Sequence, residues 1–291
     1  MNRYSIKDLE KITGIKAHTI RMWEKRYNII EPKRTVTNIR FYSDEDLKKL
    51  MNISTLNKNG IKISEIVELS SNQICEKIIE LNSSYGGTDT YINSLIIATA
   101  ELNESLFNKI ISGSIVKNGF EKTYTSILQP FLEKIGIMWQ SGSINPAQEH
   151  FISGLIRQKL IVSIDNLEES ETDFKNKIIL FLPENELHEI GLLYYYYLLK
   201  KSGYKVIYLG QSVPLDDLKK VQLIKNVDYF LTIITTGQTK EKLKSYISRL
   251  SDLLPDKTIF ATGLQIKEYN IDFPSNILPV SNFNDIKEKI K

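Results

Sequence analysis

The stretch KIILFLPENELHEIGLLYYYYLLKKSGYKVIYLG, residues 177–210, indicates the fold class of the C-terminal part of this chain. It begins and ends with short apolar runs whose length is typical of buried strands. Between them lies an apolar segment long enough for a helix, which ends near Gly203. A strand, a helix and a second strand in this order predict two parallel strands joined by a crossover helix.

Three more apolar runs alternate with amphipathic segments after this stretch. The expected strands are residues 229–235, 258–263 and 276–281, and the expected helices are residues 215–226, 239–254 and 284–291. Five buried strands separated by helices predict a doubly wound, five-stranded, parallel Rossmann-like sheet. Such sheets bind ligands at the carboxyl ends of their strands. The motif ENELHEIG, residues 184–191, follows the first strand and is therefore a candidate site.

His188, inside this motif, is one of only three histidines in the chain. A buried histidine satisfied by hydrogen bonds is the plainest interpretation. Zinc binding would need two or three further ligands, and the other histidines, His18 and His150, lie in other segments. A phosphoacceptor or general base is a third interpretation, but no glycine-rich phosphate loop or nucleophile elbow accompanies the residue.

A fourth interpretation is an axial ligand to a cofactor metal that brings its own equatorial ligands. Glu186 could accept a hydrogen bond from the far imidazole nitrogen, which fixes the tautomer and raises the basicity of the nitrogen that meets the metal. Gly191, at the start of the following helix, would let a bulky ligand approach closely. The arrangement acid-x-His-x-x-Gly fits this interpretation, and all four stay open on these residues alone.

Residues 88–168 have a helical pattern, with apolar residues recurring every three or four positions. Pro130 interrupts this pattern once, but the apolar period resumes after it, so we expect a kink rather than the end of a helix. The four expected helical segments are residues 90–102, 104–116, 124–139 and 147–164. They predict a four-helix bundle.

The composition, with 42% hydrophobic and 25% charged residues, is that of a globular protein. The apolar runs are shorter than the ~20 residues that cross a bilayer, and the N-terminus lacks a signal-peptide pattern. We therefore expect a cytoplasmic protein with no membrane partner. Cys75 is the one cysteine, which excludes an intramolecular disulfide.

The N-terminal segment is basic. Residues 1–60 hold 13 lysines and arginines against 7 acidic residues, a surplus of six, so with a net charge of +3 overall the remainder carries −3. Two short helices separated by a turn at Gly14 are expected, with Ser5 as the first N-cap and Ser43 beginning another helix after a basic loop. Two helices and a basic wing suit major-groove binding with flanking phosphate contacts.

This segment resembles the winged helix-turn-helix of the MerR family of transcription regulators. The resemblance runs from Tyr4 to about Leu69 and includes RMWEKRY at 21–27, PKRT at 32–35 and NIRFYSDED at 38–46. It implies an operator in double-stranded DNA as the partner. The side chains expected to face the groove and its edges are His18, Thr19, Arg21, Trp23 and Arg26. The side chains expected to hold backbone phosphates are Arg34, Asn38, Arg40 and Tyr42.

The motif around His188 resembles that of cobalamin-binding domains, in which the histidine replaces the cofactor's own base beneath cobalt. In that family a Ser-x-Leu on a later strand and a Gly-Gly after the next shape a slot for the displaced nucleotide tail. The corresponding positions read Thr232-Ile233-Ile234 and Thr262-Gly263. Thr232 keeps the hydroxyl, whereas Thr262 adds a side chain where the family has none, so the resemblance implies weakened tail binding.

Trp139, followed after nine residues by Glu149-His150, resembles the pattern of the cobalamin-dependent, light-sensing MerR-type repressors, the CarH and LitR group. The resemblance implies that Trp139, Glu149 and His150 cover the upper face of adenosylcobalamin or another cobalamin. Light-sensing members have a histidine directly after the tryptophan, which becomes the upper ligand after photolysis. Here that position is Gln140, and an amide is a poorer cobalt ligand than imidazole.

The resemblance implies three domains: a DNA-binding head at residues 1–75, a capping bundle at 76–170 and a cobalamin-binding Rossmann-like domain at 171–291. We expect a transcriptional regulator, a repressor and not an enzyme, whose DNA binding and assembly as a homo-oligomer, dimer or tetramer, depend on cobalamin. In the related photoreceptors the dark, adenosyl-bound tetramer binds DNA and photolysis dissociates it. The alternatives are a cobalamin-independent repressor switched by a protein partner and a corrinoid methyl-carrier protein, which gives no reason for the DNA-binding head.

Overall fold

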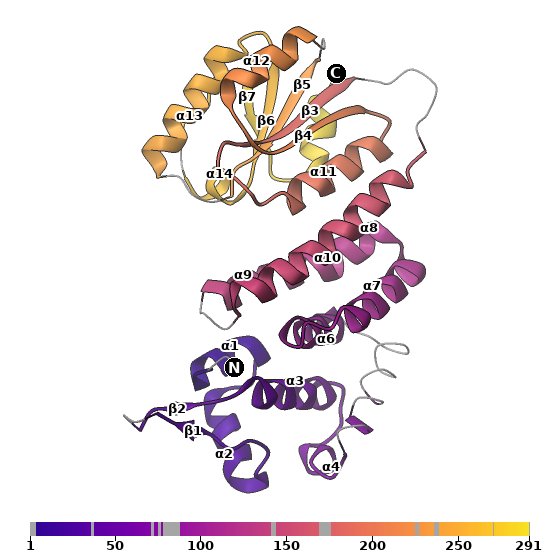
Figure 1. Ribbon diagram of the computed structural model, residues 1–291, viewed down its shortest axis with the longest axis vertical. Helices are drawn as coiled ribbons and strands as arrows, with labels where there is room; N and C mark the ends of the chain where they lie inside the picture. Colours follow the sequence, from indigo (N-terminus) through magenta and orange to yellow (C-terminus); the bar gives the residue numbers. More distant parts are fainter. Residues whose placement is uncertain are drawn as a thin grey trace. The chain divides into compact units, whose positions relative to one another are not determined.

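A computed structural model describes residues 4–35, 38–70, 73–74, 77, 88–140, 144–168, 176–224, 227–235, 239–269 and 271–290 (Figure 1). The chain divides into two compact units, residues 1–155 and 156–291. Cys75 and the domain boundaries expected at 75–76 and 170–171 lie outside the described residues. Within the described part, no helix has both the length and the apolar character that crossing a membrane requires.

The N-terminal segment forms a winged helix-turn-helix. Capping boxes begin its first and third helices, with Ser5 and Ser43 as the N-caps, and Gly14 ends the first helix with a φ of 74°. Both caps and the turn confirm the sequence-based expectation. The elements are α1 (Ile6–Thr13), α2 (Ala17–Tyr27), β1 (Lys33–Arg34), β2 (Arg40–Phe41), α3 (Asp44–Lys58) and α4 (Ile63–Ile66), and β1 pairs with β2 antiparallel.

The helical bundle follows. Its elements are α6 (Thr88–Ala100), α7 (Glu104–Asn118), α8 (Phe120–Thr123), the π-helix η1 (Tyr124–Leu128), α9 (Gln129–Gln140) and α10 (Pro146–Asp165). The helix continues through Pro130, as expected. Directly before the proline the backbone widens, and the N–H of Gln129 donates to the carbonyl of Tyr124, five residues back. This wide turn gives room for a ring that would otherwise crowd the preceding turn.

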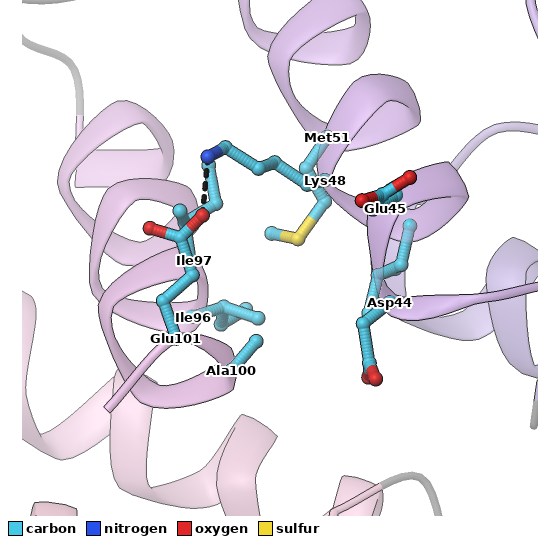
Figure 2. A pocket seen from close by; sticks show the side chains of 9 residues that line it. Asp44, Glu45, Lys48, Met51, Ile96, Ile97, Ala100 and Glu101 are labelled. Carbon is cyan, nitrogen blue, oxygen red and sulfur yellow. Dashed lines mark hydrogen bonds and ion pairs between the residues drawn. The ribbon is translucent and has the colours of Figure 1, made fainter. Parts of the chain in front are cut away.

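Helix α3 of the head packs against α6 of the bundle within the first unit. The side-chain amide of Asn93 donates to the hydroxyl of Thr55 over 2.9 Å, and both residues are buried. Lys48 pairs with Glu101 beside a hollow of about 110 Å³ whose floor includes Met51 (Figure 2). The hollow is large enough to hold water molecules.

The second unit contains a five-stranded, fully parallel sheet among its described residues, with the strand order β4-β3-β5-β6-β7. The strands are β3 (Lys177–Pro183), β4 (Lys205–Val213), β5 (Tyr229–Ile233), β6 (Thr258–Thr262) and β7 (Ile277–Pro279). This confirms the doubly wound sheet. The order reverses between β3 and β5, which is where sheets of this kind bind ligands.

Helices cover both faces of this sheet. They are α11 (Ile190–Lys201), α12 (Leu215–Ile224), α13 (Lys240–Leu253), α14 (Leu264–Glu268) and α15 (Phe283–Lys289). The apolar cluster on one face includes residues of α11 and α15, and the cluster on the other includes residues of α12, α13 and α14. The short helix α14 follows Gly263 directly and was not expected, because five residues are too few for an amphipathic period.

Candidate functional site

The loop after β3 holds an exposed histidine against a buried carboxylate. The side chain of His188 is 59% exposed, whereas that of Glu186 is 3% exposed. Nδ1 of His188 lies 2.6 Å from Oε1 of Glu186, which also accepts from the backbone N–H of His188 over 3.1 Å. A proton on Nδ1 would place the imidazole lone pair on Nε2, the nitrogen that would then meet a metal.

The same carboxylate joins two loops at the point where the strand order reverses. Oε2 of Glu186 accepts from the backbone N–H of Thr235, just after β5, over 2.9 Å. Glu186 therefore connects the ends of β3 and β5. A buried carboxylate with several donors holds its neighbours in one arrangement, because leaving an acceptor unpaired costs about 1–3 kcal/mol.

A second buried glutamate follows the histidine. Oε1 of Glu189 lies 2.6 Å from Nε of Arg157 on α10, and Oε2 accepts from the hydroxyl of Tyr208 on β4 over 2.8 Å. Burial, together with the hydrogen bond to Glu189, raises the pKa of Tyr208 far above its ordinary value. His188 thus lies between two anchored carboxylates. Sequence reasoning missed Arg157 and Glu189, since nothing in the motif identifies a partner on a distant helix.

Gly191 and Thr232 lie on opposite faces of the sheet. A Cβ added to Gly191 would be 3.3 Å from Cδ1 of Ile233, a member of the α11-side cluster. Neighbouring strand residues point to opposite faces, and Phe230 and Ile234 belong to the other cluster. Thr232 therefore faces α12 and α13, where its buried hydroxyl has no hydrogen-bond partner in the described structure. The hydroxyl of Thr232, which corresponds to the serine of the tail-slot motif, therefore lies on the face of the sheet opposite to α11.

Thr262 and Gly263 end β6. Thr262 is buried, and its side chain shares a hydrogen bond with Tyr195 of α11, whose pKa is raised by burial. Gly263 has a φ of 116°, and a Cβ there would come within 2.3 Å of the carbonyl oxygen of Ile234. Glycine is required at this turn by the chain's own backbone.

The three expected residues of the bundle lie on α9 and α10. Trp139 is 46% exposed, although an indole of its size usually buries well. On α10, Nδ1 of the exposed His150 lies 2.9 Å from Oε2 of Glu149, and Ser153 donates to the other oxygen of Glu149 over 2.5 Å. The side chain of Gln140 lies outside the described structure.

The second helix of the head, α2, presents basic groups to solvent. His18, Arg21 and Arg26 are exposed and Thr19 is half-buried, as groove contacts require. Trp23 was expected to face the groove and Tyr42 to hold a phosphate, but Trp23 is 6% exposed and Tyr42 is fully buried. Both expectations are corrected, because both side chains pack in the core of the head. Their spacing suits either role, because aromatic residues next to arginines occur in both.

The wing continues this basic surface. A guanidinium nitrogen of Arg34 donates to the side-chain oxygen of Asn38 over 2.7 Å, and Arg40 is exposed. Arg21 of α2 and Arg40 of the wing line one hollow of about 400 Å³, together with Lys25. The structure thus gathers a groove residue and a phosphate residue on one concave surface. Its three basic side chains outnumber Glu24 and Glu31, which also line it.

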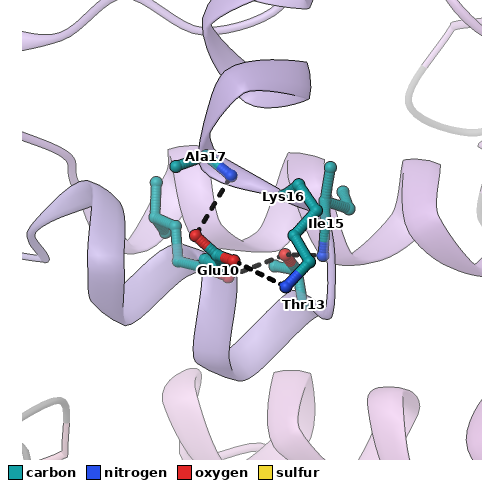
Figure 3. Close-up of polar contacts among 6 residues, drawn as sticks. Glu10, Thr13, Ile15, Lys16 and Ala17 are labelled. Carbon is teal, nitrogen blue, oxygen red and sulfur yellow. Dashed lines mark hydrogen bonds and ion pairs between the residues drawn. The ribbon is translucent and has the colours of Figure 1, made fainter.

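Glu10 of α1 caps the helix expected to enter the groove (Figure 3). Helix α2 begins after Lys16, which makes no side-chain cap of its own. Oε2 of Glu10 accepts from the backbone N–H of Ala17 over 3.2 Å, and Oε1 lies 3.1 Å from Nζ of Lys16. The hydrogen bond from Lys16 lowers the pKa of this carboxyl. Sequence reasoning missed this cap, because it comes from another helix rather than from the N-cap position.

Comparisons with known proteins match the head and the bundle. Residues 4–73 match the model of the MerR HTH family regulatory protein, and residues 91–162 match that of the B12 binding domain. The chain is a MerR-type helix-turn-helix transcriptional regulator with a B12 binding domain, which confirms the sequence-based expectation of a regulator rather than an enzyme. The second match supports a cobalamin as the class of cofactor.

Two relatives of this chain are named transcriptional repressors. The HTH-type transcriptional repressor CarH of Myxococcus xanthus is 27% identical over 87% of this chain and 85% of its own length. The repressor CarA of the same organism is 26% identical over 72% of this chain and 68% of its length. Among solved structures, a Methanosarcina barkeri monomethylamine corrinoid protein is 17% identical, with a TM-score of 0.49 over 69% of this chain and 93% of that chain.

The donors around His188 fit an axial ligand. Cobalamin brings four equatorial nitrogens in its ring and needs the protein to supply one axial donor. In the part of the chain that the structure describes, no three histidine, cysteine or acidic side chains are gathered where they could hold a metal ion. One exposed imidazole with a buried carboxylate on its far nitrogen is the donor set that a metal with its own ring requires.

Proposed function

We propose that this chain is a DNA-binding repressor whose DNA binding and homo-oligomerisation are controlled by a cobalamin, adenosylcobalamin in the first instance. The observation that carries the proposal is the Glu186–His188 pair, an exposed imidazole fixed by a buried carboxylate at the reversal of strand order. Residues 1–75 would be the DNA-binding head, 76–170 the capping bundle and 171–291 the cofactor domain.

In this proposal His188 is the lower axial ligand of the cobalt, and Glu186 fixes its tautomer. Trp139, Glu149 and His150 would cover the upper face, and the exposure of Trp139 and His150 supports that role. When bound, the cofactor would supply a cobalt–carbon bond that can be broken. Gln140 is a poorer ligand than imidazole, so we do not extend the proposal to a light state with two histidines.

The head would contact the operator through Arg21, Arg26 and His18 on α2 and through the wing arginines, with Thr19 at the edge of the groove. The exposure of these side chains supports the assignment. Assembly would strengthen binding, because two heads on two half-sites convert weak single contacts into a high effective concentration. Control of assembly by the cofactor would therefore control occupancy of the operator.

The cofactor is tested with purified full-length protein. Adenosylcobalamin and methylcobalamin are added in the dark, and the absorption spectrum and the elution volume are recorded before and after green light. We expect retained cobalamin with the spectrum of a histidine-ligated cobalt, and loss of that spectrum in His188→Ala. No retained cobalamin by the unmodified chain would overturn the proposal. Retention without a change of size on illumination would remove light as the input.

DNA binding is tested by gel shift with Arg21→Ala. Losing one base contact should weaken operator binding by ~1–3 kcal/mol and relax the preference at one base pair. Arg249→Ala, an exposed arginine on α13, removes the same charge outside the head and should leave binding unchanged. An Arg21→Ala protein with unchanged affinity and sequence preference would refute the assignment.

A further inference from the structure

Ligation by His188 leaves the nucleotide tail of a cobalamin without its usual place. One axial position takes one ligand, so the benzimidazole at the end of the tail must leave the cobalt when the imidazole binds. The displaced base then either enters the protein or stays in solvent. This step rests on the proposed function. The space around the loop after β3 then determines whether the site binds a corrinoid with or without a nucleotide tail.

The α11 side of β5 is filled by the chain's own side chains. Ile233 is 6% exposed, and its Cδ1 lies 3.3 Å from where a Cβ of Gly191 would be. Ile233 packs in one cluster with Leu192 of α11 and Phe260 of β6. The space that the glycine leaves beside the helix start is therefore occupied by an isoleucine.

The neighbouring strand end is closed as well. Thr262 is 4% exposed, and its side chain shares a hydrogen bond with Tyr195, which packs against the same cluster as Ile233. The ring of Tyr195 also lies edge-on to Phe283, with centroids 6.4 Å apart. Inserting an aromatic base here would require breaking that hydrogen bond and moving two packed side chains.

The hydroxyl that could have received the base does not face this space. Thr232 lies on the α12 side of β5, where its oxygen is buried without a partner in the described structure. At its carboxyl end the α11 side of β5 thus presents the aliphatic carbon of Ile233, and the hydroxyls of Thr262 and Tyr195 nearby are already hydrogen-bonded to each other, whereas a buried base would need a polar contact. Volume and polarity both oppose an inserted tail.

We infer that this site takes a corrinoid without a nucleotide tail, such as a cobinamide, in preference to a complete cobalamin. His188 and Glu186 hold the cobalt side in either case. A complete cobalamin binds more weakly, because its tail must stay outside the fold or displace packed side chains. Such overpacking typically weakens binding about tenfold to a hundredfold.

The test compares two probes that differ in the tail alone, adenosylcobinamide and adenosylcobalamin. Each is titrated into full-length protein in the dark by calorimetry, and absorption spectra report whether an imidazole ligates the cobalt. We expect histidine-ligated spectra with both probes and a dissociation constant about tenfold or more lower for the cobinamide. Equal binding, or tighter binding of the cobalamin, overturns the inference.

Variants that open the slot give the sharper result. Ile233→Ser and Thr262→Gly, singly and together, should tighten cobalamin binding relative to cobinamide binding. Ile234→Ser makes the same change one residue along, on the opposite face of the sheet, and should leave the ratio unchanged. The ratio of the two dissociation constants, measured on one protein preparation, is insensitive to a loss of stability. Thermal melts identify any variant that fails to fold.

The outcomes separate the inference from the proposed function. Binding of neither corrinoid overturns the proposed function and the inference with it. Binding of cobalamin at least as tight as that of cobinamide, lost in His188→Ala, overturns the inference and leaves the proposed function standing. A ratio that does not move when both slot residues are reduced also overturns the inference.

Discussion

Glu10 in the DNA-binding head and Glu186 in the sheet unit make the same kinds of contact in different surroundings. Each carboxylate accepts from a backbone N–H of another element and lies against a basic side chain, Lys16 in the head and His188 in the sheet unit. The side chain of Glu10 is 32% exposed and that of Glu186 is 3% exposed. Water can replace a lost contact at the first residue but not at the second.

This difference in exposure means that the conformation of the His188 loop depends on one side chain, that of Glu186, more than the start of α2 depends on Glu10. An exposed carboxylate contributes little, because solvent screens its charge and competes for its donors. A buried carboxylate fixes the positions of the groups that donate to it, since a low local dielectric strengthens each hydrogen bond. The loop of His188 is therefore more sensitive to one substitution than the start of the groove-facing helix.

Glu186→Ala should have the largest effect. It removes the acceptor that holds the imidazole and the N–H of Thr235, so cobalamin affinity should fall about 10–100-fold. Spectrophotometric titration measures the loss. Glu184→Ala, an exposed glutamate two residues earlier, should bind as the unmodified chain does. Equal affinities in the two variants would break the comparison between buried and exposed carboxylates.

Arg157→Ala should have the next largest effect. It leaves the carboxylate of Glu189 buried, with the hydroxyl of Tyr208 still donating to it. Because the arginine itself is largely exposed, we expect a loss of about 1 kcal/mol of stability. Chemical denaturation of the full chain measures it. Gln158→Ala, the exposed neighbour on α10, is the control. Identical unfolding curves for both variants would remove Arg157 from the support of this loop.

Glu10 should show a small effect on stability that disappears in acid. The hydrogen bond from Lys16 lowers the pKa of Glu10 below its ordinary 4.5, so its contribution is present above pH 4.5 and is lost as the pH falls through the lowered value. Melts of the unmodified chain and of Glu10→Gln should differ above pH 4.5 and converge below it. Glu68→Gln, another exposed glutamate of the head, should show no such convergence.

Tyr42 should give the smallest pH-dependent effect, and that dependence should appear only in alkali. Burial, and then the charge of Glu24, raises the pKa of Tyr42 to about 12 from 10.0. The protonated phenol therefore contributes stability that is complete below pH 10 and is lost as the pH rises through 12. Tyr42→Phe should flatten the alkaline limb of a stability profile. If the stability of Tyr42→Phe fell with rising pH as steeply as that of the unmodified chain, the alkaline loss of stability would come from another group.

The fold was predictable because its signals are local. Strand lengths, the caps at Ser5 and Ser43, and the continuation through Pro130 all follow from neighbouring residues. The site was predictable only in part. The motif around His188 indicated Glu186 correctly, since two residues along a loop cannot be far apart.

The rest depends on which face of an element a residue occupies and on distant contacts. A shift of one position on a strand changes the face, so the motif alone did not show that Thr232 lies on the face of the sheet opposite to α11. The face of a helix is uncertain in a similar way: Trp23 was expected to face the groove, but it packs in the core. Arg157 meets Glu189 across 32 positions of sequence, and no local pattern encodes such a pair.

The buried hydrogen bond between Asn93 and Thr55 restricts how helices α3 and α6 can be positioned along each other. A purely apolar contact between α3 and α6 would tolerate sliding, whereas a buried amide leaves its hydroxyl partner at a cost of about 1–3 kcal/mol. The two helices therefore favour a single registration. The orientation of α2 in the head therefore depends on the orientation of α6. If α6 moved, α3 and α2 would move with it as a rigid group.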